Sequence, residues 1–307
     1  MFLVTIGINN GTEEIKNYIY SRMDLIKQEG FDLIYEDYVI NEDLFIKCTL
    51  KDNLLTRLTE RKSYEDVKYH VSQVIAETII QYWEPRLIKK IVKDNYFYLS
   101  DKERSSVCSI AAKLLQEEKM IQPGGFYRMT RKSKVIKAVL DYLSADDILN
   151  IDGFVNFRLN DYINELSEII ERAIEIFVAE REYNEFIKLL RYFVEIQECK
   201  LDTLHLKQCA DGKYLLLDEA LNKINSEYFD ELKSEVIDSE INYDDLLIST
   251  LITISPRKIF LHDIGSFRNR ELVQTIKNVF ADRIYICQGC EICSSSLVVR
   301  ETNNFSI

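Results

Sequence analysis

The chain has 307 residues, of which 29% are charged and 47% hydrophobic, and its formal net charge is −12. This charge argues against nucleic-acid binding, and against attachment to an anionic membrane through the overall field, although a local basic patch can still act. Nine Gly and three Pro are few for this length and favour helices. The start MFLVTIGINN has no basic leader, and no stretch approaches the roughly 18–20 apolar residues of a membrane span, so we expect a mostly helical α+β protein of the cytoplasm.

Residues 1–60 predict a small βαββ lobe. The expected elements are a buried strand at 2–8, a helix at 13–29 and a hairpin with strands at 31–35 and 44–50. Gly30 is typical of the residue that follows a helix. Such a lobe can present a peptide or ligand surface, but a docking lobe for the helices that follow is the favoured interpretation.

Residues 61–200 predict a helical domain. Helical periodicity is expected over 64–83, 85–92 and 100–119, where Ser100 and Glu103 form a capping box. The stretch 153–198 has apolar residues at alternating steps of three and four and contains no Pro. A single helix of that length would span roughly 65–70 Å. We therefore expect two long helices, or one bent helix, with the change of direction near Arg181 to Asn184, where the stripe weakens.

A basic run follows the loop signal Pro123-Gly124-Gly125. Its members are Arg128, Arg131, Lys132, Lys134 and Lys137. Free amides at a helix start and nearby basic side chains favour phosphate or an RNA backbone. The run matches neither a Walker A loop nor a dinucleotide fingerprint, so a solvated basic face is favoured over an anion or nucleic-acid site.

Two segments of the long-helix stretch carry a resemblance. These are DGFVNFRLNDY at residues 152–162 and YNEFIKLLRYFVEIQ at 183–197. They resemble the YtxC-like family, which is associated with sporulation in endospore-forming Firmicutes, and the resemblance covers essentially the whole chain. It implies a sporulation-associated cytoplasmic protein and carries over no functional residue.

Polar positions in the first of these segments are candidates for an interaction surface. They are Asn156, Arg158, Asn160 and Asp161. The favoured interpretation is that they form the solvated face opposite Val155, Leu159 and Tyr162. The wide apolar stripe itself can pack within the chain or against a second copy, so partners or self-association are expected.

Residues 201–307 predict a small, mixed α/β lobe. The expected elements are a hairpin of 201–208 and 213–217 around Asp211-Gly212, helices at 226–239 and 243–253, a strand at 258–262, a helix at 269–281 and a strand at 283–287. The strand-helix-strand order predicts a parallel pair with a right-handed crossover. Twelve acidic and four basic residues between 201 and 250 make nucleic acid an unfavourable partner for this lobe.

The chain ends with the motif Cys287-x2-Cys290-x2-Cys293. Cysteines two residues apart around a glycine-containing turn can bind one soft metal, so zinc or iron–sulfur is the candidate cofactor. A bacterial ferredoxin run would place a further cysteine where this chain has Leu297. Seven cysteines, an odd number, fit reduced thiols or a metal site better than disulfides.

The fourth ligand follows from the strand model. If the two strands are parallel neighbours, His262 and Cys287 both emerge at carboxyl ends, which meet at one sheet edge. Cys209 at the hairpin is the other candidate ligand. The alternative is that the three terminal thiols are simply reduced residues of a frayed tail.

Catalytic motifs are absent from the sequence. There are three histidines, with no H-E-x-x-H and no G-x-S-x-G, although a Cys290–His262 nucleophile pair stays open. We therefore expect a non-enzymatic interaction or regulatory factor. The alternatives are a metal or thiol redox module at the terminal cysteines and an anion or nucleic-acid binder at the basic run.

Overall fold

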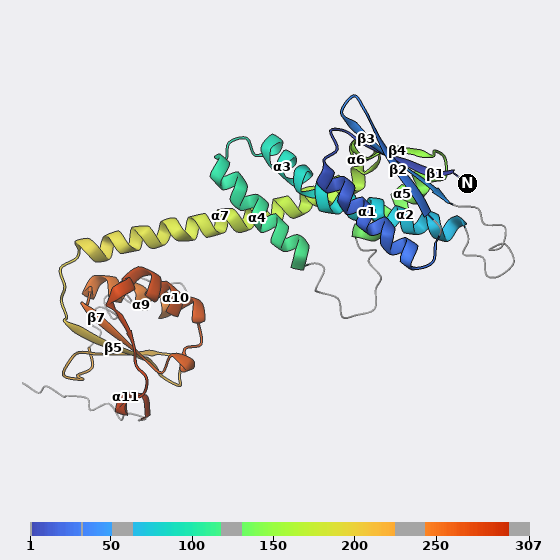
Figure 1. Ribbon diagram of the computed structural model, residues 1–307. Helices are drawn as coiled ribbons and strands as arrows, with labels where there is room; N and C mark the ends of the chain where they lie inside the picture. The colour runs from blue at the N-terminus through green and yellow to red at the C-terminus, as the bar shows by residue number, and fades with distance from the viewer. Residues whose placement is uncertain (1, 32, 51–63, 118–130, 225–242, 295–307) are drawn as a thin grey trace, which may run out of the picture. The chain divides into compact units, whose positions relative to one another are not determined.

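The computed structural model describes residues 2–31, 33–50, 64–117, 131–224 and 243–294 (Figure 1). The chain forms two compact units, Met1–Ala179 and Glu180–Ile307, and each is described by itself. Helix predominates and each unit has a small sheet, so the expected mostly helical α+β class is confirmed. The sequence-based division into 1–60, 61–200 and 201–307 stays a prediction.

The sheet of unit 1 has four strands in the order β2-β3-β1-β4. The predicted βαββ start is confirmed as β1 (Phe2–Ile8), α1 (Glu13–Gln28), β2 (Leu33–Ile40) and β3 (Asp43–Leu50). Strand β4 (Ile148–Asn150) pairs in parallel with β1 and was missed, because three residues are too short to show a strand period. Its Leu149 is fully buried in the core that α1 also covers.

The helices of unit 1 share this core. They are α2 (Tyr64–Thr78), the π-helix η1 (Ile79–Trp83), α3 (Glu84–Asn95), α4 (Asp101–Glu117), α5 (Arg131–Leu143), α6 (Ile151–Arg158) and the first part of α7 (Asn160–Ile196). Pro85 lies in the first turn of α3, where a missing backbone N–H costs nothing. The capping box of Ser100 and Glu103 is confirmed. The predicted loop at Pro123-Gly124-Gly125 lies outside the described residues.

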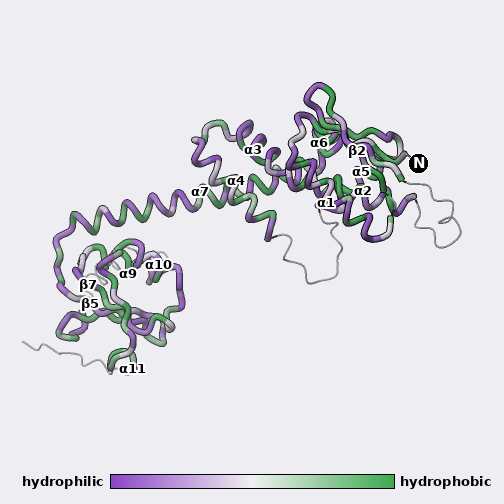
Figure 2. The backbone as a smooth tube through the Cα atoms, viewed as in Figure 1, coloured by the Kyte–Doolittle hydropathy of each residue, from purple (hydrophilic) through white to green (hydrophobic). Residues whose placement is uncertain are grey.

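The break in the long-helix stretch lies at Leu159, and the expected division into two helices near Arg181 to Asn184 is wrong, whereas the alternative of one bent helix stays a prediction. Helix α7 runs for 37 residues through that point, where glutamate and arginine are good helix formers. Asn160 and Asp161 follow the break and are typical of a helix start. Along α7, hydrophobic and hydrophilic residues alternate (Figure 2).

The weakening of the apolar stripe marks a change of core. Leu166, Ile169 and Ala173 are buried in the core of unit 1, whereas Ile187 and Val194 are buried in the core of unit 2. The charged residues between them belong to neither core. The stripe therefore weakens because its packing partner changes while the helix continues.

The sheet of unit 2 has the order β6-β5-β7-β8. Its elements are β5 (Thr203–Gln208), β6 (Tyr214–Leu217), α9 (Tyr243–Ile254), β7 (Lys258–His262), the 3-10 helix η2 (Ile264–Ser266), α10 (Arg270–Phe280), the 3-10 helix η3 (Ala281–Arg283), β8 (Ile284–Ile286) and α11 (Glu291–Ser294). The predicted hairpin is confirmed by antiparallel β5 and β6, and the predicted parallel pair by β7 and β8. The predicted helix at 226–239 lies outside the described residues.

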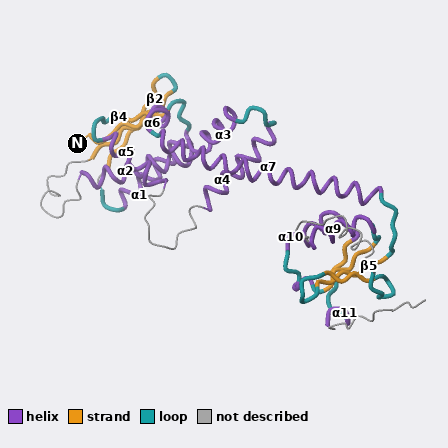
Figure 3. The backbone as a smooth tube through the Cα atoms, turned by 180° about the vertical axis from the view of Figure 1, so that it is seen from behind, coloured by secondary structure: helices purple, strands orange, loops and turns teal. Residues whose placement is uncertain are grey.

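Different elements cover the two faces of this sheet. Helices α9 and α10 pack on one face with Leu204, Leu206, Ile259 and Leu261, which are fully buried. The short helix α11 lies on the other side (Figure 3). Among the described residues, no helix is both long and apolar enough to cross a membrane.

A buried polar network fixes helix α5 against α3 and α7. The Glu84 carboxylate accepts hydrogen bonds from Arg131 Nη1, at 3.1 Å, and from the Tyr162 hydroxyl. The other Arg131 Nη donates to the Leu115 carbonyl at 3.0 Å. Burial and the neighbouring carboxylate raise the pKa of Tyr162, so its hydroxyl stays protonated as a donor.

Removing this carboxylate is expected to destabilise unit 1. Glu84→Ala removes the buried carboxylate that the Arg131 guanidinium and the Tyr162 hydroxyl bind, and it is expected to cost about 3–5 kcal/mol of unfolding free energy. The single tryptophan, Trp83, gives a fluorescence signal for urea unfolding of this unit. The matched control is Lys134→Gln, which breaks an exposed ion pair with Glu165 and is expected to cost about 0–1 kcal/mol. Equal losses in both variants would contradict a buried network.

Candidate metal centre

Two parallel strands place the first two candidate ligands at one sheet edge. His262 is the last residue of β7, and Cys287 directly follows β8. The Cys287 backbone N–H donates to the Leu261 carbonyl at 3.0 Å, which continues the ladder between these strands. The two side chains therefore emerge together at the carboxyl ends, as the strand model predicted.

A glycine turn brings the other two thiols back toward this edge. Gly289 has φ +134°, a backbone conformation that side-chain-bearing residues rarely adopt. The turn at Gly289 reverses the direction of the chain. Cys290 comes directly after it, and Cys293 lies in the short helix α11. The Cys293 N–H donates to the Cys290 carbonyl at 3.0 Å, which holds the two cysteines in one turn.

The four side chains converge on one point. One ligand atom from each of His262, Cys287, Cys290 and Cys293 lies within 4.8 Å of all the others. His262 Nδ1 is 3.3 Å from Cys290 Sγ and 3.5 Å from Cys293 Sγ. Cys293 Sγ is 3.8 Å from Cys290 Sγ and 3.7 Å from Cys287 Sγ.

These distances fit the ligands of a single tetrahedral ion. Zinc–sulfur bonds of about 2.3 Å place two sulfurs about 3.8 Å apart, and a zinc–nitrogen bond of about 2.0 Å places nitrogen and sulfur about 3.5 Å apart. An iron–sulfur cluster spreads its thiolates over several irons, so its sulfurs would lie farther from one another. The geometry therefore fits one ion better than a cluster.

His262 is held in the orientation and charge state of a ligand. Its side chain is 3% exposed, and its Nε2 lies 2.9 Å from His205 Nδ1. If a metal binds His262 Nδ1, Nε2 must carry the proton and donate to His205 Nδ1, which would fix the tautomers of both rings. Burial, and then the neighbouring His205 and Lys207, lower the pKa of His262, so the imidazole is neutral.

His205 lies on the same sheet face as the candidate ligands. Its residue pairs with Phe260 in the parallel register, and the two rings stack with centroids 5.3 Å apart. Burial lowers the pKa of His205, although Asp218 opposes the shift. The hydrogen-bond partner of His262 is thus itself a neutral imidazole.

The neighbouring thiols shift the pKa values of Cys287 and Cys290 in opposite directions, so the two compete for the negative charge of a thiolate. Desolvation disfavours the Cys290 thiolate, but backbone N–H groups at Cys293 and Ile292 and the neighbouring thiols outweigh it and lower the pKa of Cys290. The Gly289 N–H favours the Cys287 thiolate, but desolvation and the neighbouring sulfurs outweigh it and raise the pKa of Cys287. A bound cation would relieve this competition, since it stabilises every thiolate that touches it.

Helix α11 is fastened to the sheet beside these ligands. Lys207 Nζ donates to the carbonyls of Ile292, at 2.6 Å, and Cys293, at 3.2 Å. Ile292 packs against Leu215 and Leu217 of β6. Cys209, the other fourth-ligand candidate, packs against this apolar cluster and is not one of the four converging side chains.

The basic run is occupied by internal ion pairs. Arg131 binds Glu84, Lys132 Nζ lies 2.6 Å from Glu77, and Lys134 binds Glu165. Arg128 lies outside the described residues. Because three acidic side chains neutralise three of its members, the run offers a phosphate less charge than its sequence indicates. The sequence could not show these pairs, since each joins residues at least 31 positions apart.

The remaining candidates are exposed. Asn156, Arg158 and Asp161 all lie at the surface of unit 1, and Arg158 lines a surface pocket with Asp141 and Asp146. Cys290 and His262 do meet, as a nucleophile pair would. However, Cys293 shares the same imidazole nitrogen, an arrangement typical of metal ligands rather than of a catalytic dyad.

The comparisons with known proteins agree on one family. The model of the YtxC-like family matches residues 69–285, a range that includes His262 and ends just before Cys287. The chain is 22% identical to "Uncharacterized protein YtxC" of Bacillus subtilis (strain 168) over 220 residues, which are 71% of this chain and 76% of that protein. No solved structure matches. Since the family model covers more than half of the chain, the protein belongs to the YtxC-like family.

Proposed function

We propose that unit 2 binds one zinc ion through Cys287, Cys290, Cys293 and His262. The observation that carries the proposal is the convergence of four ligand atoms at the spacing of a single tetrahedral ion. Three thiolates and one imidazole are a donor set that suits zinc. Four protein ligands leave no open position for a substrate, which supports a non-enzymatic role for this site.

The ion would fasten the end of the described chain to the sheet. Residues 287–293 cross the face opposite α9 and α10, and among their side chains only Ile292 is a buried large hydrophobic residue. So little apolar area stabilises a cover only weakly. Zinc bound to ligands from β7, the turn and α11 supplies the missing free energy, because metal binding to a site formed by folding adds to folding.

Metal content tests the proposal directly. The full chain purified under reducing conditions is expected to hold close to one zinc per chain, and Cys287→Ser/Cys290→Ser/Cys293→Ser to hold none. The control is Cys108→Ser/Cys199→Ser/Cys209→Ser, which alters three cysteines outside the site and is expected to keep the zinc. Elemental analysis measures both. Folded protein that stays metal-free with zinc supplied would contradict the proposal. Bound iron with visible absorbance would show that the site binds iron and not zinc.

The His205 imidazole, which is hydrogen-bonded to the candidate ligand His262, is expected to affect the zinc affinity. His205→Ala removes the acceptor for His262 Nε2–H and should weaken zinc binding about 10–100-fold, as loss of such outer partners does. Competition with a chromophoric chelator at constant pH measures the affinity. Phe260→Leu is the matched control, because it removes the ring stacked on His205 and keeps the hydrogen bond. Unchanged affinity in His205→Ala would show that the bond does not orient the ligand.

A second function, protein interaction, is favoured by the outer face of α7. Its residues in unit 2 are buried on one side at Ile187, Leu190 and Val194. The other side also carries large apolar side chains, all 40–58% exposed: Phe186, Leu189, Tyr192, Phe193 and Ile196. A surface helix normally turns polar residues outward, so this second apolar stripe indicates a partner. Spacing of three and four is that of helix pairing, and we take a second copy as the partner.

Sedimentation equilibrium tests this interaction. The wild type is expected to dimerise with increasing concentration, and Phe186→Ser/Phe193→Ser to shift to monomer. The control, Arg158→Glu/Asp161→Lys, changes the exposed polar candidates of unit 1 and should leave the association unchanged. A wild type that stays monomeric would refute self-association. The sporulation role rests on the family resemblance, and the same stripe variant in the host is expected to lower the yield of heat-resistant spores.

A further inference from the structure

The turn between α3 and α4 carries two aromatic side chains in solvent. Phe97 is 78% exposed and Tyr98 is 66% exposed, whereas Val92 before them and Leu99 after them are buried. The two rings lie edge to face with centroids 6.1 Å apart. Exposing two large apolar side chains to water is unfavourable, so their position at the tip of the turn indicates that a partner covers them.

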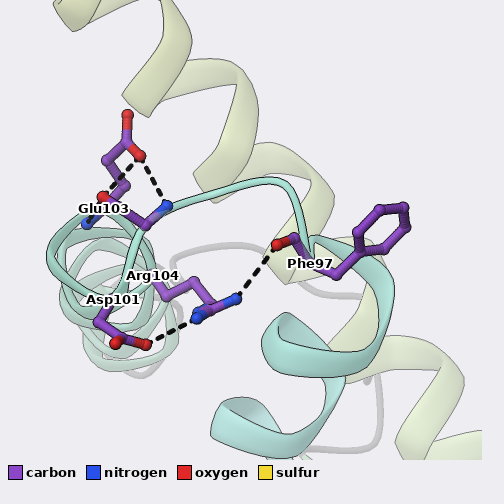
Figure 4. A network of polar contacts seen from close by, with 5 residues as sticks. Phe97, Asp101, Glu103 and Arg104 are labelled. Atoms are coloured by element: carbon purple, nitrogen blue, oxygen red, sulfur yellow. Dashed lines mark hydrogen bonds and ion pairs between the residues drawn. The ribbon is translucent and has the colours of Figure 1, made fainter.

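The turn is held in place by its own hydrogen bonds (Figure 4). Ser100 N and Oγ both donate to the Glu103 carboxylate, at 2.8 and 2.7 Å, and close the start of α4. Arg104 donates to the Phe97 carbonyl at 3.4 Å and to Asp101 at 2.6 Å. Leu99 anchors the turn in the core. The aromatic tip is therefore a fixed feature and not a frayed end.

A basic stripe adjoins the tip. Helix α3 buries Leu87, Ile88 and Val92, and its opposite side carries four exposed basic residues on one stripe: Arg86, Lys89, Lys90 and Lys93. Among the described residues, none of the four forms an ion pair. From 86 to 104 there are six basic and three acidic residues, a local charge of +3 in a chain of −12.

We propose that this turn docks unit 1 onto an anionic lipid surface. Phe97 and Tyr98 enter the interface, where aromatic rings are favoured, and the basic stripe contacts the anionic headgroups. The acidic remainder of the chain opposes this only weakly, because salt screens charges beyond about 10 Å at 0.1 M.

Size and chemistry favour a lipid surface over a protein. A stable protein interface takes about 20–30 residues a side, whereas the tip offers two apolar side chains. Lysines act as mobile point charges, which suit a fluid layer of headgroups without fixed geometry. A lipid surface also needs no groove on the protein.

Vesicle flotation of the full chain tests the proposal. Binding is expected to phosphatidylcholine vesicles that contain phosphatidylglycerol, and to weaken in high salt and without the anionic lipid. Lys89→Gln/Lys90→Gln/Lys93→Gln should lower the partition coefficient by about fivefold per charge removed. Phe97→Ser/Tyr98→Ser should reduce it at every salt concentration, since the apolar contribution is not screened.

The control variant is Phe157→Ser, which removes an equally exposed phenylalanine, 78%, from α6 of the same unit. It is expected to bind vesicles as the wild type does. No binding of the wild type to anionic vesicles, or equal binding of the wild type and Phe97→Ser/Tyr98→Ser, would overturn the proposal. Self-association without lipid that the Phe97→Ser/Tyr98→Ser variant abolishes would also overturn it and assign the turn to a protein contact.

Discussion

The register of the parallel ladder between β7 and β8 is the constraint on which the candidate metal centre depends. Side chains alternate along a strand, so a slip by one residue would turn His262 toward the helices and away from the thiols. Leu261 and Ile259 prevent that slip, because both are fully buried against α9 and α10 on the opposite face. The polar site on one face is thus positioned by hydrophobic packing on the other.

The two faces of the sheet in unit 2 differ in how much structure packs on them. Helices α9 and α10 bury one face, whereas the turn after β8 and the four-residue helix α11 cover only part of the other, where Tyr285 is 43% exposed. Hydrogen bonds from Lys207 and the packing of Ile292 hold this segment, but both are small contributions. A shared ion is the kind of link that small folds use where little apolar area is buried, so the proposed zinc ion would account for the thiols and the short helix occurring in the same segment.

The four converging residues of the candidate site could be predicted from the sequence, whereas the contact of His262 with His205 needed the pairing register of the strands. The spacing of the three cysteines and the rule that parallel strands end at one edge were enough to predict His262. They could not predict His205, because its contact with His262 depends on which residue of β5 pairs with Phe260. The ion pairs of the basic run could not be predicted either, because the partner of Arg131 lies 47 positions away in α3. The division of the long stretch into two helices near Arg181 to Asn184 was wrong for a related reason: a stripe shows where a face is buried, not which core buries it.

Helix α7 divides its packing between two cores, and this separates the chemistry of the chain. Leu166 and Ala173 belong to the core of unit 1, which also holds the aromatic turn in place through Leu99. Val194 belongs to the core of unit 2, which orients the strands that end in the candidate ligands. Substitution of the candidate ligands is therefore a change next to the core of unit 2, whereas Leu99, which anchors Phe97 and Tyr98, belongs to the core of unit 1. The proposed zinc site and the proposed lipid contact therefore rest on residues positioned by different cores.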